Sequence, residues 1–262
     1  MPHCLVIGVG PGLGLGCVRR FQKEGYDVSM IARHEGRLNS WKSEIENTYA
    51  YPCDISDLDN YRTCLNQIVS DKGIPDVVIY NAAKASFGDY LNIDASDFEK
   101  NYRINTTGLL VTAQTIAPQM VQRGSGSIVV TGNTGALRGS PNFVGWSPSK
   151  AGQRILSEAL ARDLGSKGIH VCYIVVDALI DMPFARRNRP QLPDDAYSKP
   201  DELAETIYNT SVQPKSAWSI YVELRPFKEK WYKSNQSSVV GAAARRQFKP
   251  DSLFVKGVET DG

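Results

Sequence analysis

The feature that most constrains this chain is an apolar run that ends in a cluster of glycines near the N-terminus. The run covers 4–7, the glycines follow the spacing Gly8-x-x-x-Gly12-x-Gly14, and a helical pattern starts directly after them. This order predicts a strand, a tight turn and a helix. Glycine lets the backbone turn sharply and approach a ligand, and a helix N-terminus offers free N–H groups to a phosphate. We therefore expect a dinucleotide-binding turn, with a plain connection between two elements as the structural alternative.

Short apolar runs alternate with helical patterns along most of the chain. Strands separated by helices at intervals of about 25–30 residues are typical of parallel βαβ units. The sequence therefore predicts an α/β fold with a doubly wound parallel sheet. We expect strands at 4–7, 27–32, 48–52, 76–80, 126–131, 169–176 and 218–224, with helices after the glycines and at about 33–47, 57–70, 96–122, 145–164 and 200–212.

Composition limits the classes of protein to which this chain can belong. Of the 262 residues 42 % are apolar and 22 % are charged, and the net charge is +2, so no tail for nucleic acid is indicated. Five cysteines, an odd number, are spread widely and have neither disulfide nor metal-ligand spacing. No apolar run approaches the ~20 residues of a membrane span, and the N-terminus enters a strand at once. We expect a cytoplasmic protein with no metal, nucleic-acid or membrane partner.

The regular alternation of strands and helices ends after the sixth expected strand. Residues 179–199 are rich in proline and contain a basic cluster, and we expect an irregular segment with a flexible lid at 182–199. A single domain is predicted over 1–226. The polar stretch 227–262 is interpreted as a C-terminal extension that is poorly ordered or docked on a partner.

Five motifs, in order, resemble those of the short-chain dehydrogenase/reductases, and the resemblance covers about 3–225. It implies a three-layer Rossmann domain with a seven-stranded parallel sheet, a nicotinamide cofactor, a small-molecule substrate and a homodimer or homotetramer. The motifs are the glycine turn, Asp54, Asn81-Ala82-Ala83, Asn105 and Lys150. The implied cofactor-binding residues are Gly8, Gly10, Gly12, Leu13, Gly14, Arg33, Asp54, Ile55, Asn81, Ala82, Lys150 and Ile180.

The end of the second expected strand indicates which nicotinamide cofactor is bound. An acid often stands there in the family and holds the ribose of NAD, whereas this chain has Ala32 followed by Arg33. A guanidinium pairs well with a 2′-phosphate, so NADP(H) is expected, unless Arg33 is an ordinary surface arginine. Asp54 either accepts from the adenine amine or caps the next turn. Asn81 and Ala82 either line the cofactor or order the sheet.

The catalytic motif departs from the family pattern. The usual residues are Ser, Tyr and Lys, with Tyr four residues before Lys and Ser thirteen before Tyr. Lys150 is present, but the tyrosine position is Trp146 and the serine position is Asn133. Asn105 matches the family asparagine that holds a water next to the lysine. The implied catalytic residues are therefore Lys150, Asn105, Asn133 and Trp146.

These departures matter because reduction of a carbonyl needs a proton donor. A tyrosine phenol can supply the proton, whereas an indole N–H donates a hydrogen bond but does not titrate in the useful range. We expect Trp146 to shape the pocket or orient a substrate and Asn133 to polarise a carbonyl. Lys150 could pass a proton through a water near Asn105. Lesser candidates for the proton donor are Asp177, Asp181, Arg138, Tyr80, Lys84 and Tyr102.

Three functional interpretations remain open from the sequence. The first is an NADPH-dependent reductase that activates its substrate without tyrosine; the second is a non-redox enzyme that uses the cofactor as a scaffold. The third is a catalytically inactive, NADP(H)-binding regulatory protein. Aromatic and basic side chains in and beside the expected lid would suit an aromatic or acidic substrate, with solvated arginines as the alternative explanation; they are Phe143, Trp146, Phe184, Arg186, Arg187 and Arg189.

Overall fold

Seven strands form one parallel sheet in the order β3-β2-β1-β4-β5-β6-β9. This computed structural model describes residues 1–227, and the extension expected at 227–262 lies, apart from Phe227, outside the described residues. The doubly wound, seven-stranded parallel sheet expected from the sequence is confirmed. The strands are β1 His3–Ile7, β2 Asp27–Ala32, β3 Thr48–Pro52, β4 Val77–Tyr80, β5 Gly126–Gly132, β6 Ile169–Val176 and β9 Tyr221–Leu224.

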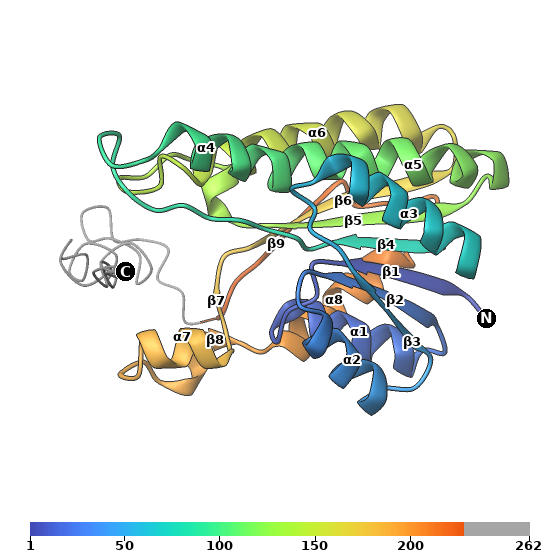
Figure 1. Cartoon of the computed structure of the whole chain (residues 1–262), viewed down its shortest axis with the longest axis horizontal. Helices are drawn as coiled ribbons and strands as arrows, with labels where there is room; N and C mark the ends of the chain where they lie inside the picture. The colour runs from blue at the N-terminus through green and yellow to red at the C-terminus, as the bar shows by residue number, and fades with distance from the viewer. Residues whose placement is uncertain (228–262) are drawn as a thin grey trace, which may run out of the picture. The chain divides into compact units, whose positions relative to one another are not determined.

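Helices connect the strands and cover both faces of the sheet. Figure 1 shows α3, α4, α5 and α6 on one face and α1, α2 and α8 on the other. The sheet is buried between two apolar cores, one on each side. None of the helices in residues 1–227 has the length and apolar composition needed to cross a bilayer. The bounds are α1 Leu13–Lys23, α2 Glu35–Glu44, α3 Leu58–Lys72, α4 Ala95–Tyr102, α5 Gly108–Arg123, α6 Ser147–Gly165, α7 Pro183–Asn188 and α8 Pro200–Ser211.

The long helix expected at 96–122 is divided by a π-helical turn. Arg103–Thr107 forms this turn between α4 and α5. Its residues are small, polar or β-branched, and π-helical turns inside α-helices often mark functional sites. Asn105, buried at 0 % exposure, lies in the turn, which therefore sets the position of one expected site residue.

The expectation of an irregular segment over 179–199 is wrong. Two short parallel strands, β7 Leu179–Ile180 and β8 Tyr197–Ser198, pair with each other and enclose α7. Arg186 on α7 bridges Asp181 at 2.7 Å and Asp194 at 2.5 Å, which ties the segment together. Strands of two residues carry no readable periodicity, and Pro183 stands at the first position of α7, where proline is favoured.

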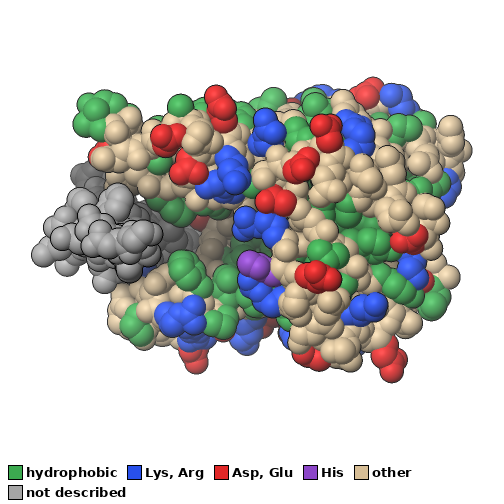
Figure 2. Space-filling model, viewed as in Figure 1, with side chains coloured by type: hydrophobic (Ala, Val, Ile, Leu, Met, Phe, Trp, Pro, Cys, Tyr) green, Lys and Arg blue, Asp and Glu red, His purple; other side chains and the backbone are tan. Residues whose placement is uncertain are grey.

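The carboxyl ends of β1, β4, β5 and β6 meet at one edge of the sheet. In a doubly wound fold, ligands bind at this edge, where the strand order reverses direction. Here β1 lies between β2 and β4, so the reversal falls beside the glycine turn. Figure 2 shows this side of the molecule hollowed between the α4 side and the α7 segment, with Lys and Arg side chains along the hollow.

Candidate active site

The glycine turn is held by close contacts that only glycine allows. Gly8 has a φ of +88°, and a Cβ there would lie 2.4 Å from the Ala82 Cα. A Cβ at Gly14 would lie 2.8 Å from the Gly8 carbonyl oxygen, so the start of α1 packs directly on the end of β1. A Cβ at Gly10, by contrast, would meet nothing within 4 Å. The turn therefore leaves open space beside Gly10 next to a helix N-terminus.

The start of α1 has the features of an anion site. Leu13 is the first residue of the helix and is buried, and the preceding residue, Gly12, provides no side-chain cap. The Leu15 backbone N–H donates to the Gly10 carbonyl oxygen at 3.0 Å, so the Leu13 and Gly14 N–H groups are the ones that can bind a phosphate. A Cβ at Gly12 would lie 3.5 Å from Ile180 Cγ2 and from Met182 Sδ. Ile180, on β7, therefore lies against the turn, and so does Met182, which the sequence reading missed.

Asn81 and Ala82 contact the glycine turn and hold it in position. The Asn81 Nδ2 donates to the Gly8 carbonyl oxygen at 2.8 Å, and its Oδ1 accepts from the Thr131 hydroxyl at 2.9 Å. These bonds connect β1, β4 and β5 at their carboxyl ends. The structure thus favours the sheet-ordering role that the sequence left open for this pair.

Arg33, Asp54 and Ile55 follow the ends of β2 and β3. Arg33 is exposed directly after β2. Burial disfavours the Asp54 carboxylate, but hydrogen bonds from Ser56 and the charge of Arg33 outweigh this effect and hold the pKa of Asp54 below its usual value. The Asp54 Oδ1 accepts from the Ser56 backbone N–H at 2.9 Å, which is the capping role considered above. Ile55 is 7 % exposed and packs in the core.

Lys150 is enclosed almost completely. Its side chain comes from the first turn of α6, and the residue is 2 % exposed. Its Nζ donates to the Gln153 Oε1 at 2.8 Å and to the Thr131 carbonyl oxygen at 3.3 Å. Burial lowers the pKa of Lys150 from 10.5 to about 7. The amine therefore exchanges a proton near neutral pH, as a general acid or base must.

Asn105 braces the loop after β4 against α6. Its Oδ1 accepts from the Lys84 backbone N–H at 2.9 Å, and its Nδ2 donates to the Lys84 carbonyl oxygen at 2.9 Å and to the Ser149 hydroxyl at 2.8 Å. Every polar atom of the Asn105 side chain has a partner. The structure thus places this residue next to the turn before Lys150 and gives it a bracing role.

Asn133 and Trp146 are in direct contact. The indole Nε1 of Trp146 donates to the Asn133 Oδ1 at 3.0 Å, and the Gly135 backbone N–H donates to the same oxygen at 2.9 Å. The Trp146 ring centroid lies 5.8 Å from the Lys150 Nζ, and the Phe87 ring stacks on the indole at 5.5 Å. Asn133, Trp146 and Lys150 therefore form one cluster at the carboxyl end of β5.

Five of the six lesser candidates for a proton donor are engaged elsewhere. Asp177 forms an ion pair with Arg225 at 2.6 Å, and the Arg186 hydrogen bonds to Asp181 lower the pKa of that carboxyl. The Tyr80 hydroxyl is buried and donates to the Ile104 carbonyl oxygen at 2.5 Å, so the expectation that it reaches the pocket is wrong. The remaining three are Lys84, paired with Asp97 at 2.9 Å, Tyr102, which donates to the Pro148 carbonyl oxygen at 3.1 Å, and Arg138, which is exposed.

Three residues of the cluster were missed by the sequence reading. Gln153 lies three residues after Lys150 in the same helix, a spacing that places two side chains on one face and could have identified it. Gly135 and Phe87 carry no comparable signal. Gly135 matters through its backbone, and Phe87 reaches Trp146 because a β-bridge joins Gly88 to Phe143 across two loops.

Comparison with known proteins gives a family-level match. A family model described as short chain dehydrogenase matches residues 2–191. A 3-oxoacyl-(acyl-carrier-protein) reductase of Thermotoga maritima is 24 % identical over 216 residues, which cover 78 % of this chain and 87 % of the relative.

Solved structures share the fold. ElxO with NADP bound superimposes with a TM-score of 0.77 at 20 % identity, covering 86 % of this chain and 97 % of that one. A variant of actinorhodin polyketide ketoreductase with NADPH gives a TM-score of 0.78 at 23 % identity, covering 86 % and 96 %. At these identities the likeness concerns the fold alone.

Proposed function

Because the chain belongs to the short-chain dehydrogenase family, we propose that it is an NADP(H)-dependent oxidoreductase with an altered active site. In this proposal Trp146 and Asn133 stand at the positions of the family's tyrosine and serine, and Lys150 is the group that exchanges the proton. The observation that carries the proposal is the buried Lys150 amine, with a pKa of about 7, in the same cluster as Asn133 and Trp146.

The residues present fit a nicotinamide dinucleotide. The open space beside Gly10 and the uncapped start of α1 would take the pyrophosphate, and Ile180 lies across from that turn. Arg33, exposed after β2 with no acid at the end of the strand, would pair with a 2′-phosphate, which favours NADP(H) over NAD(H). Lys150 lies at the carboxyl edge where the nicotinamide end would rest.

Lys150 suits proton exchange for physical reasons. When bound, a nicotinamide would supply a hydride to a carbonyl carbon, whose oxygen must then gain a proton, or would remove a hydride from an alcohol carbon, whose hydroxyl must then lose its proton. Near pH 7 the Lys150 amine is divided between its charged and neutral forms, so it can give or take that proton. Among residues 1–227, Gln153 and Thr131 accept from two of the three N–H bonds of the charged amine, which leaves the third for a ligand.

The substrate is proposed to be a small molecule whose reacting group needs no tyrosine. Arg186 is engaged by Asp181 and Asp194 and lies over the Tyr197 ring at 4.2 Å, so it is not free to bind an acidic substrate. The stacked aromatic side chains Phe87 and Trp146 favour an aromatic substrate over an acidic one.

A titration with both nucleotides tests this proposal. NADPH and NADH are added to the wild-type protein, Arg33→Ala and the control Arg37→Ala, whose arginine is exposed on the neighbouring helix α2. We expect NADPH to bind more tightly than NADH, and Arg33→Ala to lose about tenfold to a hundredfold in NADPH affinity only, since hydrogen bonds to charged groups contribute about 1.5–3 kcal/mol. Binding of neither nucleotide to the wild-type protein would contradict the proposal.

A further inference from the structure

The Asn133 carboxamide is fixed in one orientation. Its Oδ1 accepts from the Trp146 indole N–H at 3.0 Å and from the Gly135 backbone N–H at 2.9 Å. Rotating the amide by half a turn would replace the oxygen with an NH2 group and set donors against donors. Within the described part of the chain, no acceptor meets the Asn133 Nδ2. The two N–H bonds of this amide are therefore the part of it left for a ligand.

The Trp146 indole that fixes this amide is itself held in place. A Cβ at Gly135 would lie 2.8 Å from the Trp146 Cδ1 and 3.0 Å from its Nε1, so the edge of the indole rests against the Gly135 backbone. Phe87 stacks on one face of the indole with an interplanar angle of 17°. Trp146 directly precedes α6, and its carbonyl oxygen accepts from the Lys150 backbone N–H at 3.2 Å. These contacts direct the indole N–H at Asn133 rather than at a ligand.

We propose that Trp146 is a positioning residue, which aims the Asn133 NH2 group at a hydrogen-bond acceptor, a carbonyl oxygen, on the substrate. Trp146 has a single N–H donor, and Asn133 occupies it, so the indole does not bind the carbonyl itself. Asn133 then holds the oxygen that Lys150 protonates. The assignment of a carbonyl substrate rests on the proposed function; the contact between Trp146 and Asn133 does not.

The first test examines that contact in the protein without cofactor. The full chain has four tryptophans, so its ¹⁵N spectrum contains four indole signals. Trp146→Phe, which keeps a ring and removes the N–H, identifies the Trp146 signal. Asn133→Ala should move that signal upfield and speed the exchange of its proton about fivefold, as expected for the loss of one hydrogen bond. A signal that stays in place in Asn133→Ala would overturn the proposal.

A matched control comes from a second tryptophan. The Trp218 indole N–H donates to the Gln213 carbonyl oxygen at 3.1 Å, and its ring stacks on His170, so it has similar contacts outside the cluster. Trp218→Phe should leave both the Trp146 signal and the Asn133 amide signals unchanged.

The second test uses isatin, a planar carbonyl compound, with NADP⁺, which cannot reduce it. The Asn133 carboxamide signals, identified by their loss in Asn133→Ala, should shift when isatin is added to the wild-type protein. Trp146→Phe should weaken isatin binding about fivefold to tenfold and change NADP⁺ binding less than twofold. Isatin binding that is equal in wild type and Trp146→Phe would overturn the proposal. A protein that binds no NADP⁺ would contradict the proposed function. The indole signals would then still show whether the Trp146 N–H bonds to Asn133.

Discussion

At the scale of single residues, Lys150 combines full burial with an ionisable amine. Removing an ammonium from water is costly, and here the nearest partners are two neutral oxygens rather than a carboxylate. This cost favours the neutral amine and lowers the pKa of Lys150 to about 7. A buried amine of this kind lowers the stability of the fold, and such groups are typical of sites where chemistry needs a group that titrates near neutral pH.

The low pKa of Lys150 predicts a pH-dependent stability. Between pH 7 and 10.5 the unfolded chain holds a proton on this amine and the native chain does not, so the free energy of unfolding rises with pH across this window. Lys150→Met should remove that part of the rise, and Lys23→Met, at an exposed position, should keep it. Denaturant unfolding at several pH values measures the effect. Parallel curves for wild type and Lys150→Met would contradict the prediction.

The sequence predicted single residues unevenly. The resemblance to the family implied Asn133 and Trp146 as site residues, and the structure brings both into one cluster with Lys150. The sequence could not predict which atoms of the Asn133 side chain face the indole, because the orientation of an amide depends on donors from separate loops. The sequence could not predict the bracing roles of Asn81 and Asn105 for the same reason, since both amides bond to backbone carbonyls and side-chain hydroxyls that are distant in the chain.

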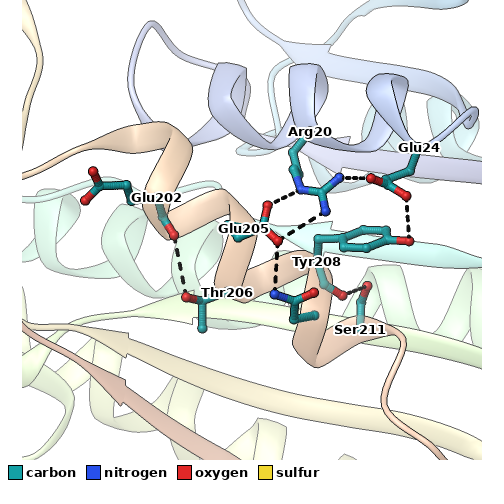
Figure 3. Close-up of polar contacts among 8 residues, drawn as sticks. Arg20, Glu24, Glu202, Glu205, Thr206, Tyr208 and Ser211 are labelled. Carbon is teal, nitrogen blue, oxygen red and sulfur yellow. Dashed lines mark hydrogen bonds and ion pairs between the residues drawn. The ribbon is translucent and has the colours of Figure 1, made fainter.

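At the scale of elements, α1 follows the glycine turn and packs against α8, which comes after the α7 segment in the chain. Figure 3 shows Arg20 on α1 directed at Glu205 on α8, and Glu24 directed at both Arg20 and Tyr208. The Arg20 guanidinium also lies 4.1 Å from the centre of the Tyr208 ring. Exposed ion pairs contribute little individually, but this network and the apolar contact beneath it fix the two helices in register.

Two glycines of this region predict opposite effects of the same substitution. A Cβ at Gly16 would lie 2.9 Å from the Pro200 carbonyl oxygen, so Gly16→Ala should push α1 from α8 and destabilise the protein by about 1–3 kcal/mol. A Cβ at Gly10 would meet nothing, so Gly10→Ala should fold as the wild type does and lose NADPH affinity, because the methyl group fills the phosphate space.

Urea unfolding and nucleotide titration of both variants separate the two effects. A Gly10→Ala protein that binds NADPH as the wild type does would contradict the placement of the pyrophosphate beside this residue. A Gly16→Ala protein of unchanged stability would contradict the close packing of α1 on α8.

Periodicity predicted most elements because each strand of the sheet is long enough to show it. The strands of the seven-stranded sheet are four to eight residues long, and they and the helices between them lie close to the ranges expected from the sequence. The π-helical turn Arg103–Thr107 and the strands β7 and β8 were missed, since one changed hydrogen-bond pattern or a two-residue pairing leaves no repeat in the sequence.

At the scale of the whole molecule, α5 and α6 leave large apolar side chains uncovered. Leu110 on α5 is 37 % exposed and Ile155 on α6 is 53 % exposed, and Figure 1 shows the two helices on the same face of the sheet. We propose that this face joins copies of the chain into the homodimer or homotetramer expected from the family resemblance. Contiguous exposed apolar patches often mark such contacts.

A charge on this face should separate the copies. Ile155→Glu is expected to reduce the mass in solution to that of a single chain, because an unpaired carboxylate is costly to bury in an apolar interface. The matched control is Ile220→Glu, whose isoleucine is 47 % exposed beside the edge strand β9 rather than on α6. Light scattering after gel filtration measures the mass. An oligomer that persists in Ile155→Glu would contradict the use of this face.

The most direct measurement for the whole protein follows deuterium from NADPH that carries two deuterium atoms at C4 of the nicotinamide into products of a carbonyl panel that includes isatin. We predict that one deuterium appears on the carbon of the reduced carbonyl for each NADPH oxidised, and that Lys150→Met, while still folded, loses this transfer by at least about a hundredfold, the usual contribution of general acid–base catalysis. A protein that binds NADPH tightly but transfers no deuterium to any member of the panel would contradict an oxidoreductase and favour a cofactor-binding protein without redox chemistry.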